Sequence, residues 1–473
     1  MQVARGGCYA LWSLCKSKKN RLLIKRAGGF PLLAKLIKTK NISLLIPVIG
    51  SLQECAAEKS YCLAIQAEGM IQDFVSNMLN DNIELRKHCA SAIFKCAQEE
   101  ETRALVKSNN GLQPLVELIK DHSNHENKEL MAAVTGALWK LSMSEDNVKT
   151  FQELELVPVL ISLLKENAEG LDDLQFNLGK IQILTNIVGA IAESAKTPQN
   201  RENIRERGGL KPVIKLIAST SPGLLVNVAS AIGRMAEDVE TIEQTIQYPN
   251  PQPSGLDQIR NLDGVRLLWS LLKNPNESVQ AAAAWALSPC IRNAENSGDM
   301  VRSFVGGLEL VCGLLESKDQ EVLAAVSFAI ANIGKDKENL AVITDHGVIH
   351  KLARLAVTQD DRLRAKLAEA ISHCCELESN RALFGKAGAV APLVNYLTSS
   401  DLEVHRTTAA ALHQLSKDPW NCVTMHQSGV VPHLLRLIGS EDEAVQEAAA
   451  DCLQNIRKLA LACEKFRYQH LKT

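Results

Sequence analysis

The amino-acid sequence predicts an all-α fold, a solenoid in which three helices recur about every 41 residues. The first marker is a short turn, often begun by Gly, that precedes a pair of apolar residues. Aligned on that pair, the turn falls at Gly28, Gly69, Asn110, Glu155, Gly208, Asp263, Gly306, Gly347, Gly388 and Gly429. Successive turns are 41, 41, 45, 53, 55, 43, 41, 41 and 41 residues apart. A recurrence of roughly 40 to 47 residues is typical of helical solenoids.

A second marker lies on a different predicted helix, an Ala-rich segment of the form small/Trp-Ala-Leu-x-x-Leu/Ile ahead of each turn. Its fifth position falls at Ser13, Glu54, Lys95, Lys140, Glu193, Arg234, Pro289, Asn332, His373, Gln414 and Asn455. These positions are 41, 41, 45, 53, 41, 55, 43, 41, 41 and 41 residues apart. Because two independent markers keep nearly the same spacing, the repeat frame does not depend on either one alone.

Residues 378–418 display the plan of one repeat. A short first helix begins near residues 378–381, with Asn380 as its expected N-cap. Gly388 ends that helix, because Gly tolerates the left-handed backbone that a tight stop requires. Pro392 then lies in the first turn of a second helix, where its missing N–H has no effect. Asp401 caps a third, longer helix.

Composition excludes several functional classes. The net charge of −2 gives no general attraction to nucleic acid or to a membrane surface. The 13 cysteines form no C-x-x-C pair, which favours a reducing compartment over a disulfide framework. The longest apolar run, residues 42–52, is too short to span a bilayer. We find no signal peptide, and therefore expect a soluble intracellular protein without nucleic-acid or membrane partners.

With these markers the chain resembles the armadillo-repeat family over essentially its whole length. That resemblance implies a right-handed armadillo superhelix with three helices in each repeat. Residues 137–147 (ALWKLSMSEDN) and 249–255 (PNPQPSG) further resemble the C-terminal armadillo region of docking-complex subunits that hold outer dynein arms in motile cilia.

Departures from the regular spacing suggest a domain organisation. We expect a partial first repeat at 1–27, an N-terminal half at 28–235, a Pro-rich insertion at 236–258 and a C-terminal half at 259–473. Three insertions lengthen repeats: Asp121–Glu129, Lys165–Lys180 and Glu237–Asp257. Insertions in repeat arrays form loops at one edge, which is often the binding edge.

The chain begins within a repeat, because residues 9–14 already match the third-helix marker. A solenoid end without a polar capping layer exposes its core. We therefore expect the apolar side chains of Leu11, Leu14, Leu22 and Leu23 to be uncovered.

The sequence offers little catalytic or metal-binding chemistry. His346 and His350 are separated by the helix-ending Gly347, and His122 and His125 lie in a polar insertion. The Cys374-Cys375 pair is interpreted as two small buried apolar residues. No phosphate loop, G-x-S-x-G or dinucleotide motif occurs. We expect no enzyme activity, no cofactor and no metal site.

The remaining candidate site is the face of the third helices, which lines a concave groove in armadillo proteins. The candidate partner-binding residues are Arg234, Trp285, Phe328, Asn332, His373, Gln414 and Asn455. Import receptors of the family repeat a Trp with an Asn four residues later, and here only Phe328 with Asn332 approaches that pair. A catenin-like basic groove is interrupted by Glu54 and Glu193. Both of those roles are therefore disfavoured.

Two functions remain open. The resemblance implies a scaffold of the cytoplasm and ciliary axoneme that docks outer dynein arms, with coiled-coil docking subunits, outer arm dynein and the doublet microtubule as partners. The alternative is a generic cytoplasmic or nuclear armadillo adaptor that binds an extended peptide in its groove.

Overall fold

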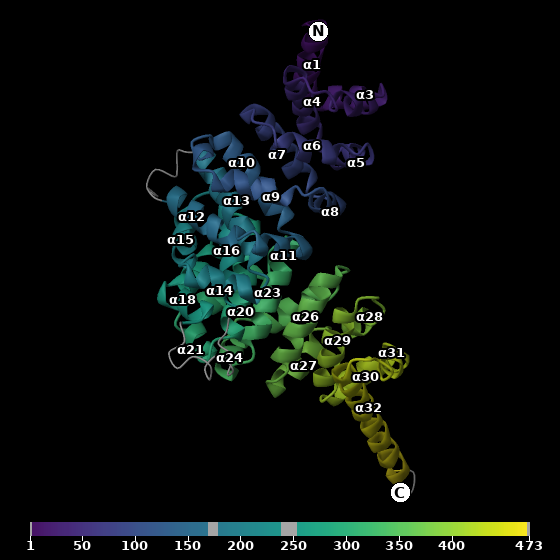
Figure 1. Ribbon diagram of the computed structural model, residues 1–473. Helices are drawn as coiled ribbons and strands as arrows, with labels where there is room; N and C mark the ends of the chain where they lie inside the picture. Colours follow the sequence, from purple (N-terminus) through teal and green to yellow (C-terminus); the bar gives the residue numbers. More distant parts are fainter. Residues whose placement is uncertain (1, 169–177, 238–252, 471–473) are drawn as a thin grey trace. The chain divides into compact units, whose positions relative to one another are not determined.

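The fold of this computed structural model consists of α-helices joined by short turns, with two short 3-10 helices and no strand among the described residues. The structure describes residues 2–168, 178–237 and 253–470 (Figure 1). The chain divides into two compact units, Met1–Asp238 and Val239–Thr473. No helix in the described ranges combines the length and the apolar composition that crossing a membrane requires.

In the first unit a lone third helix is followed by sets of a first, a second and a third helix. In chain order the elements are α1 (Gln2–Cys15), α2 (Lys18–Arg26), α3 (Gly29–Leu36), α4 (Ile42–Cys55), α5 (Lys59–Ala67), α6 (Met70–Met78), α7 (Ile83–Cys96), α8 (Glu100–Ser108), α9 (Leu112–Lys120), η1 (His122–Asn124), α10 (Lys128–Leu141), α11 (Glu145–Glu153), α12 (Leu156–Ala168), α13 (Leu178–Ser194), α14 (Pro198–Glu206), α15 (Leu210–Lys215), η3 (Leu216–Ala218) and α16 (Pro222–Met235).

The second unit repeats the same order. Its elements are α18 (Gly255–Asn261), α19 (Gly264–Leu271), α20 (Glu277–Arg292), α21 (Ser297–Arg302), α22 (Gly307–Leu314), α23 (Gln320–Ile333), α24 (Lys337–Asp345), α25 (Val348–Leu355), α26 (Asp361–Cys374), α27 (Glu378–Lys386), α28 (Val390–Tyr396), α29 (Leu402–Leu415), α30 (Pro419–Gln427), α31 (Val430–Leu437) and α32 (Glu443–His470). The predicted fold class, an α-solenoid of three-helix repeats, is confirmed. The proposed domain boundaries stay a prediction, and residues 238–252 of the Pro-rich insertion lie outside the described residues.

All ten predicted turn residues adopt a left-handed backbone. Their φ angles run from 56° at Glu155 to 79° at Gly388, and no other residue in the described ranges has a positive φ. Each of them lies between the first and the second helix of a repeat. A residue without a β-carbon adopts this conformation without strain, which explains why seven of the ten are Gly.

The third helices form the spine of each unit. They carry all eleven marker positions, and each packs beside the third helix of the next repeat (Figure 1). The contacting pairs in the first unit are α1–α4, α4–α7, α7–α10, α10–α13 and α13–α16. Those in the second unit are α20–α23, α23–α26, α26–α29 and α29–α32. Several begin with an Asn or Asp cap. The Asp401 carboxylate, for example, accepts hydrogen bonds from the backbone N–H groups of Glu403 and Val404 at 2.8 and 3.1 Å.

The expected role of Asn380 as an N-cap is wrong. Helix α27 begins at Glu378 after Leu377, and Asn380 is fully buried inside its first turn. Its Nδ2 donates to the carbonyl oxygen of Cys374 at 2.9 Å, at the end of the preceding third helix. The same Nδ2 donates to Thr344 Oγ1 at 3.0 Å, in the preceding repeat. Asn380 therefore joins successive repeats through its amide nitrogen.

One predicted insertion is described in full and the other two in part. Asp121–Glu129 contains η1 between α9 and α10. Lys165–Lys180 begins as a C-terminal extension of α12, and its residues 169–177 lie outside the described ranges.

The apolar side chains at the start of the chain are partly uncovered, as expected. Leu14, Leu22 and Leu23 are 50%, 43% and 53% exposed, whereas Leu11 is half-buried.

Replacing Gly388 or Gly429 by Val should lower the free energy of unfolding by about 1 to 3 kcal/mol, measured by thermal melting of the purified chain. An added β-carbon would meet no atom within 4 Å at either site, so the loss would come from the backbone alone. Gly313 in α22 is the matched control, because it has equally open surroundings without a positive φ. Equal melting temperatures for the Gly388→Val and Gly313→Val proteins would contradict the turn assignment.

Backbone amides before about residue 40 should exchange with deuterium faster than those of α26. Exposed leucines contribute little burial, so α1 to α3 should open at a lower free energy than a fully packed helix. Hydrogen exchange followed by mass spectrometry measures this difference. Protection of α1 to α3 equal to that of α26 would show that the exposed leucines do not weaken this end.

Candidate protein-binding surface

An aromatic pair on neighbouring third helices is the centre of the candidate surface. Trp285 of α20 and Phe328 of α23 are both half-buried, with ring centroids 5.6 Å apart and planes inclined at 42°. The neighbours of Trp285 in sequence are alanines, which explains why its large ring stays partly exposed as expected. Aromatic rings in this position are frequent anchors of protein interfaces.

Charged side chains from the next helix lie over both rings. Arg362 of α26 places its guanidinium carbon 4.8 Å from the Trp285 ring centroid, and Lys366 places Nζ 4.5 Å from the Phe328 ring centroid. Such cation–π contacts stabilise the pair and hold the cations in place. The Trp285 indole N–H donates to Glu321 Oε1 at 2.8 Å.

Ion pairs then link the cations to carboxylates of adjacent third helices. Arg362 pairs with Glu321 of α23 at 2.5 Å, and Lys366 pairs with Glu403 of α29 at 2.6 Å. Arg362 and Glu321 remain 58% and 44% exposed, so this part of the arrangement is available to a partner. We define the aromatic–charged surface as Trp285, Glu321, Phe328, Arg362, Lys366 and Glu403.

The polar candidate residues already have partners within the chain. Asn332 is buried, donates from Nδ2 to the Phe328 carbonyl oxygen at 3.0 Å and accepts from Lys335 at 3.1 Å. The remaining three are half-buried and are bonded as follows: His373 with Glu376 at 3.0 Å, Gln414 with Lys417 at 2.8 Å and Asn455 with Ser416 at 3.0 Å. A peptide backbone would have to displace these bonds to be held by the same amides.

Arg234 is exposed on α16 in the first unit, whereas the other candidate residues lie in the second unit. The structure thus brings Trp285 and Phe328 into contact and places Asn332, His373, Gln414 and Asn455 on α23 and successive third helices.

The sequence interpretation missed the charged members of the surface. Glu321, Arg362 and Glu403 occupy one position in three successive repeats, 41 residues apart, with alternating sign. This alternation of charge at the repeat period could have identified the three residues from sequence, because side chains at equal positions of adjacent repeats are neighbours.

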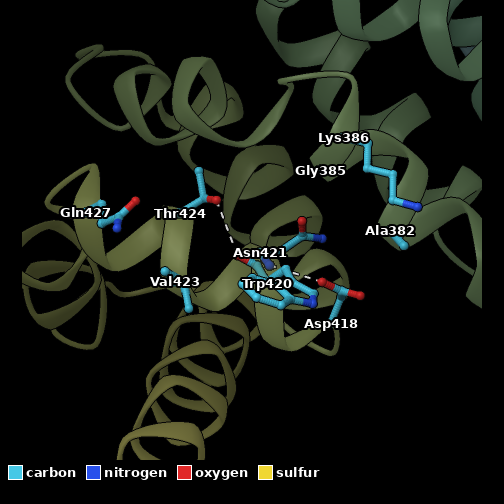
Figure 2. A pocket seen from close by; sticks show the side chains of 9 residues that line it. All are labelled: Ala382, Gly385, Lys386, Asp418, Trp420, Asn421, Val423, Thr424 and Gln427. Carbon is cyan, nitrogen blue, oxygen red and sulfur yellow. Dashed lines mark hydrogen bonds between the residues drawn. The ribbon is translucent and has the colours of Figure 1, made fainter.

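A second feature is an open hollow of about 580 Å³ between the first helices α27 and α30. Figure 2 shows Lys386 and Ala382 on one side and Trp420 with Asp418 on the other. Trp420 is 78% exposed. Asn421 contributes to the wall but is a structural residue, since its Nδ2 donates to the Arg381 and Leu415 carbonyl oxygens at 2.9 and 3.1 Å.

The pair Cys374-Cys375 lies in the core, as expected. Both residues are fully buried, and burial raises the pKa of both thiols, so they remain protonated at neutral pH. His346 caps the end of α24 and His350 lies in α25, on opposite sides of the Gly347 turn.

Comparison with known proteins agrees with the repeat frame. The model of the Armadillo/beta-catenin-like repeat matches residues 253–288, 378–417 and 423–458. Over 361 residues, 76% of the chain, the sequence is 51% identical to outer dynein arm-docking complex subunit 2 of Bos taurus. It is 44% identical over 361 residues, again 76% of the chain, to the armadillo repeat-containing protein gudu of Drosophila melanogaster. The matched part spans 32% of the bovine protein and 50% of the fly protein.

A solved structure from work on the interaction between cadherin and beta-catenin has the same fold. It superposes with a TM-score of 0.59 at 17% identity, covering 96% of this chain and 88% of the other. The left-handed turn in every repeat, the three-helix order and the matching repeats lead to one conclusion: the chain belongs to the armadillo-repeat family.

Proposed function

We propose that this chain is a non-enzymatic scaffold that helps to dock outer dynein arms onto the doublet microtubules of cilia. The observation that carries the proposal is the 51% identity over 361 residues to a protein named as a subunit of the outer dynein arm-docking complex. Identity at this level over 76% of the chain extends well beyond what a shared repeat fold requires, because the beta-catenin structure has the same fold at 17% identity.

The proposed partners are coiled-coil subunits of the docking complex, outer arm dynein and the doublet microtubule, and the proposed location is the axoneme. The aromatic–charged surface supports a coiled-coil partner. Coiled coils present rows of Glu and Lys or Arg beside their apolar seam. The alternating row of Glu321, Arg362 and Glu403 offers complementary charges, and the partly exposed Trp285 ring offers apolar contact.

A generic adaptor that grips an extended peptide receives less support. Peptide-binding armadillo grooves hold the peptide backbone with free amide side chains, whereas Asn332, Gln414 and Asn455 are bonded within this chain. Breaking such bonds costs affinity, because each displaced group must find an equivalent partner.

A tagged copy of the chain expressed in multiciliated cells tests the proposal. We expect the tag to locate along axonemes and to co-precipitate coiled-coil docking subunits from an axonemal extract. A diffuse cytoplasmic or nuclear signal, without those subunits in the precipitate, would favour the adaptor.

Two changes to the aromatic–charged surface should weaken capture of docking subunits about tenfold, or about 1.4 kcal/mol, measured by titrated pull-down. Trp285→Ala removes the aromatic anchor, and Arg362→Glu reverses an exposed charge that has little part in the core.

Trp420→Ala is the matched control, because it removes an exposed Trp from a first helix of the same unit. Loss of capture in Trp420→Ala, with full capture by both surface variants, would move the docking site to the hollow between α27 and α30.

A further inference from the structure

Two insertions in neighbouring repeats of the first unit meet at a cluster of three side chains. His122 and His125 belong to the segment between α9 and α10, and Glu166 lies near the end of α12 in the next repeat. One ligand atom from each, a ring nitrogen or a carboxylate oxygen, lies within 4.8 Å of the other two. We propose that these three side chains bind a divalent transition-metal ion, and that Zn²⁺ is the ion that suits them.

The hydrogen bond from His125 to Ile119 fixes which ring nitrogen faces Glu166. Its side chain is only 10% exposed, and Nε2 lies 2.9 Å from the carbonyl oxygen of Ile119. A carbonyl oxygen only accepts, so Nε2 carries the hydrogen. In a neutral ring Nδ1 then presents a lone pair, and it faces Glu166 Oε2 at 3.1 Å.

Two lone pairs at this separation repel each other unless a cation lies between them. That cation is either a proton on Nδ1 or a metal ion bound to both atoms. The position of His122 favours the metal ion, because its ring centroid lies 4.7 Å from that of His125. A second imidazole supplies another nitrogen ligand to a metal ion, whereas an ion pair between His125 and Glu166 makes no use of it.

The chemistry of the three ligands selects the class of metal. Two imidazole nitrogens and a carboxylate oxygen form a common ligand set for Zn²⁺, whereas Mg²⁺ and Ca²⁺ prefer oxygen ligands throughout. Two ligands of a tetrahedral Zn²⁺ are about 3.3 Å apart. The 3.1 Å between His125 Nδ1 and Glu166 Oε2 fits that geometry. His122 is exposed, so rotation of its side chain can complete the third contact, and the fourth position remains for water or a partner's side chain.

The backbone around the two histidines is already held in place. Asn124 is buried and donates from Nδ2 to the Leu118 carbonyl oxygen at 3.0 Å. Asp121 accepts a hydrogen bond from the Ser123 N–H at 3.0 Å. The contact from His125 to Ile119 is of the kind that orients metal-binding histidines, which donate their second ring N–H to a carbonyl or carboxylate. Little backbone entropy would therefore be lost when a metal ion binds, and the main cost would be the ordering of the exposed His122 and Glu166 side chains.

The proposal departs from the expectation of no metal site, which the sequence analysis based on the position of His122 and His125 in a polar insertion. Glu166 follows His125 by 41 residues and was not recognisable as its neighbour from sequence. A metal ion here would join the η1 segment to α12, and so connect the insertions of two successive repeats.

The test is titration of the metal-free, untagged 473-residue chain with Zn²⁺ by calorimetry and with Co²⁺ by absorption spectroscopy. We expect one ion per chain, visible Co²⁺ bands without an intense thiolate charge-transfer band, and a higher melting temperature with Zn²⁺. The thiolate band matters because Cys463 is exposed and could bind either metal on its own. Absence of binding, or binding accompanied by that band, would overturn the proposal.

Two separate substitutions, His122→Gln and Glu166→Gln, should each weaken Zn²⁺ binding by about 10- to 100-fold or more, since loss of a ligand costs at least as much as loss of a group that orients one. Both side chains are exposed, so the fold should survive, which circular dichroism checks. The matched control is the double variant His346→Gln/His350→Gln, whose histidines lie on either side of a turn and should not contribute. Unchanged affinity in both single variants would show that Zn²⁺ binds elsewhere.

Discussion

The whole array depends on one backbone constraint, a left-handed residue after the first helix of each repeat. At ten positions the chain passes from the first to the second helix through a φ between 56° and 79°. A right-handed residue there would continue the first helix and carry the second helix away from the spine. Seven Gly residues meet the constraint without strain, and Asn110, Glu155 and Asp263 adopt the same conformation although they carry a β-carbon.

Once the turn is fixed, equal positions in adjacent third helices become neighbours. Residues that recur at the repeat period along the sequence therefore form a row across the surface. Glu321, Arg362 and Glu403, 41 residues apart, become successive members of such a row, and Trp285 contacts Phe328 for the same reason. Buried amides such as those of Asn380 and Asn421 stabilise the stacking of repeats from within the core, because each donates a hydrogen bond to the preceding repeat. The aromatic–charged surface and the bonds between repeats thus both result from the same repeat period.

The sequence predicted this framework well because its determinants are periodic. Even Glu155, which no residue preference would place in a left-handed turn, was found from its register alone. Side-chain partners between repeats were not predictable in the same way. Asn380 was expected to cap its own helix, yet it is buried and bonded to the repeat before it. The contacts of Glu321 with Trp285 and of Glu166 with His125 depend on how far side chains reach between helices, which spacing does not specify.

Stacking of the repeats also brings insertions of adjacent repeats together. Side chains from two repeats can then form a cluster that neither repeat contains alone. The segment between α9 and α10 and the extension of α12 belong to successive repeats, so stacking brings His125 against Glu166. Neither insertion holds two imidazoles and a carboxylate in this arrangement by itself. A site of this kind exists only while the two repeats are stacked, and a ligand that binds it must stabilise their junction. In a repeat array each unit contacts mainly its neighbours, so a ligand that joins two repeats acts on that one junction.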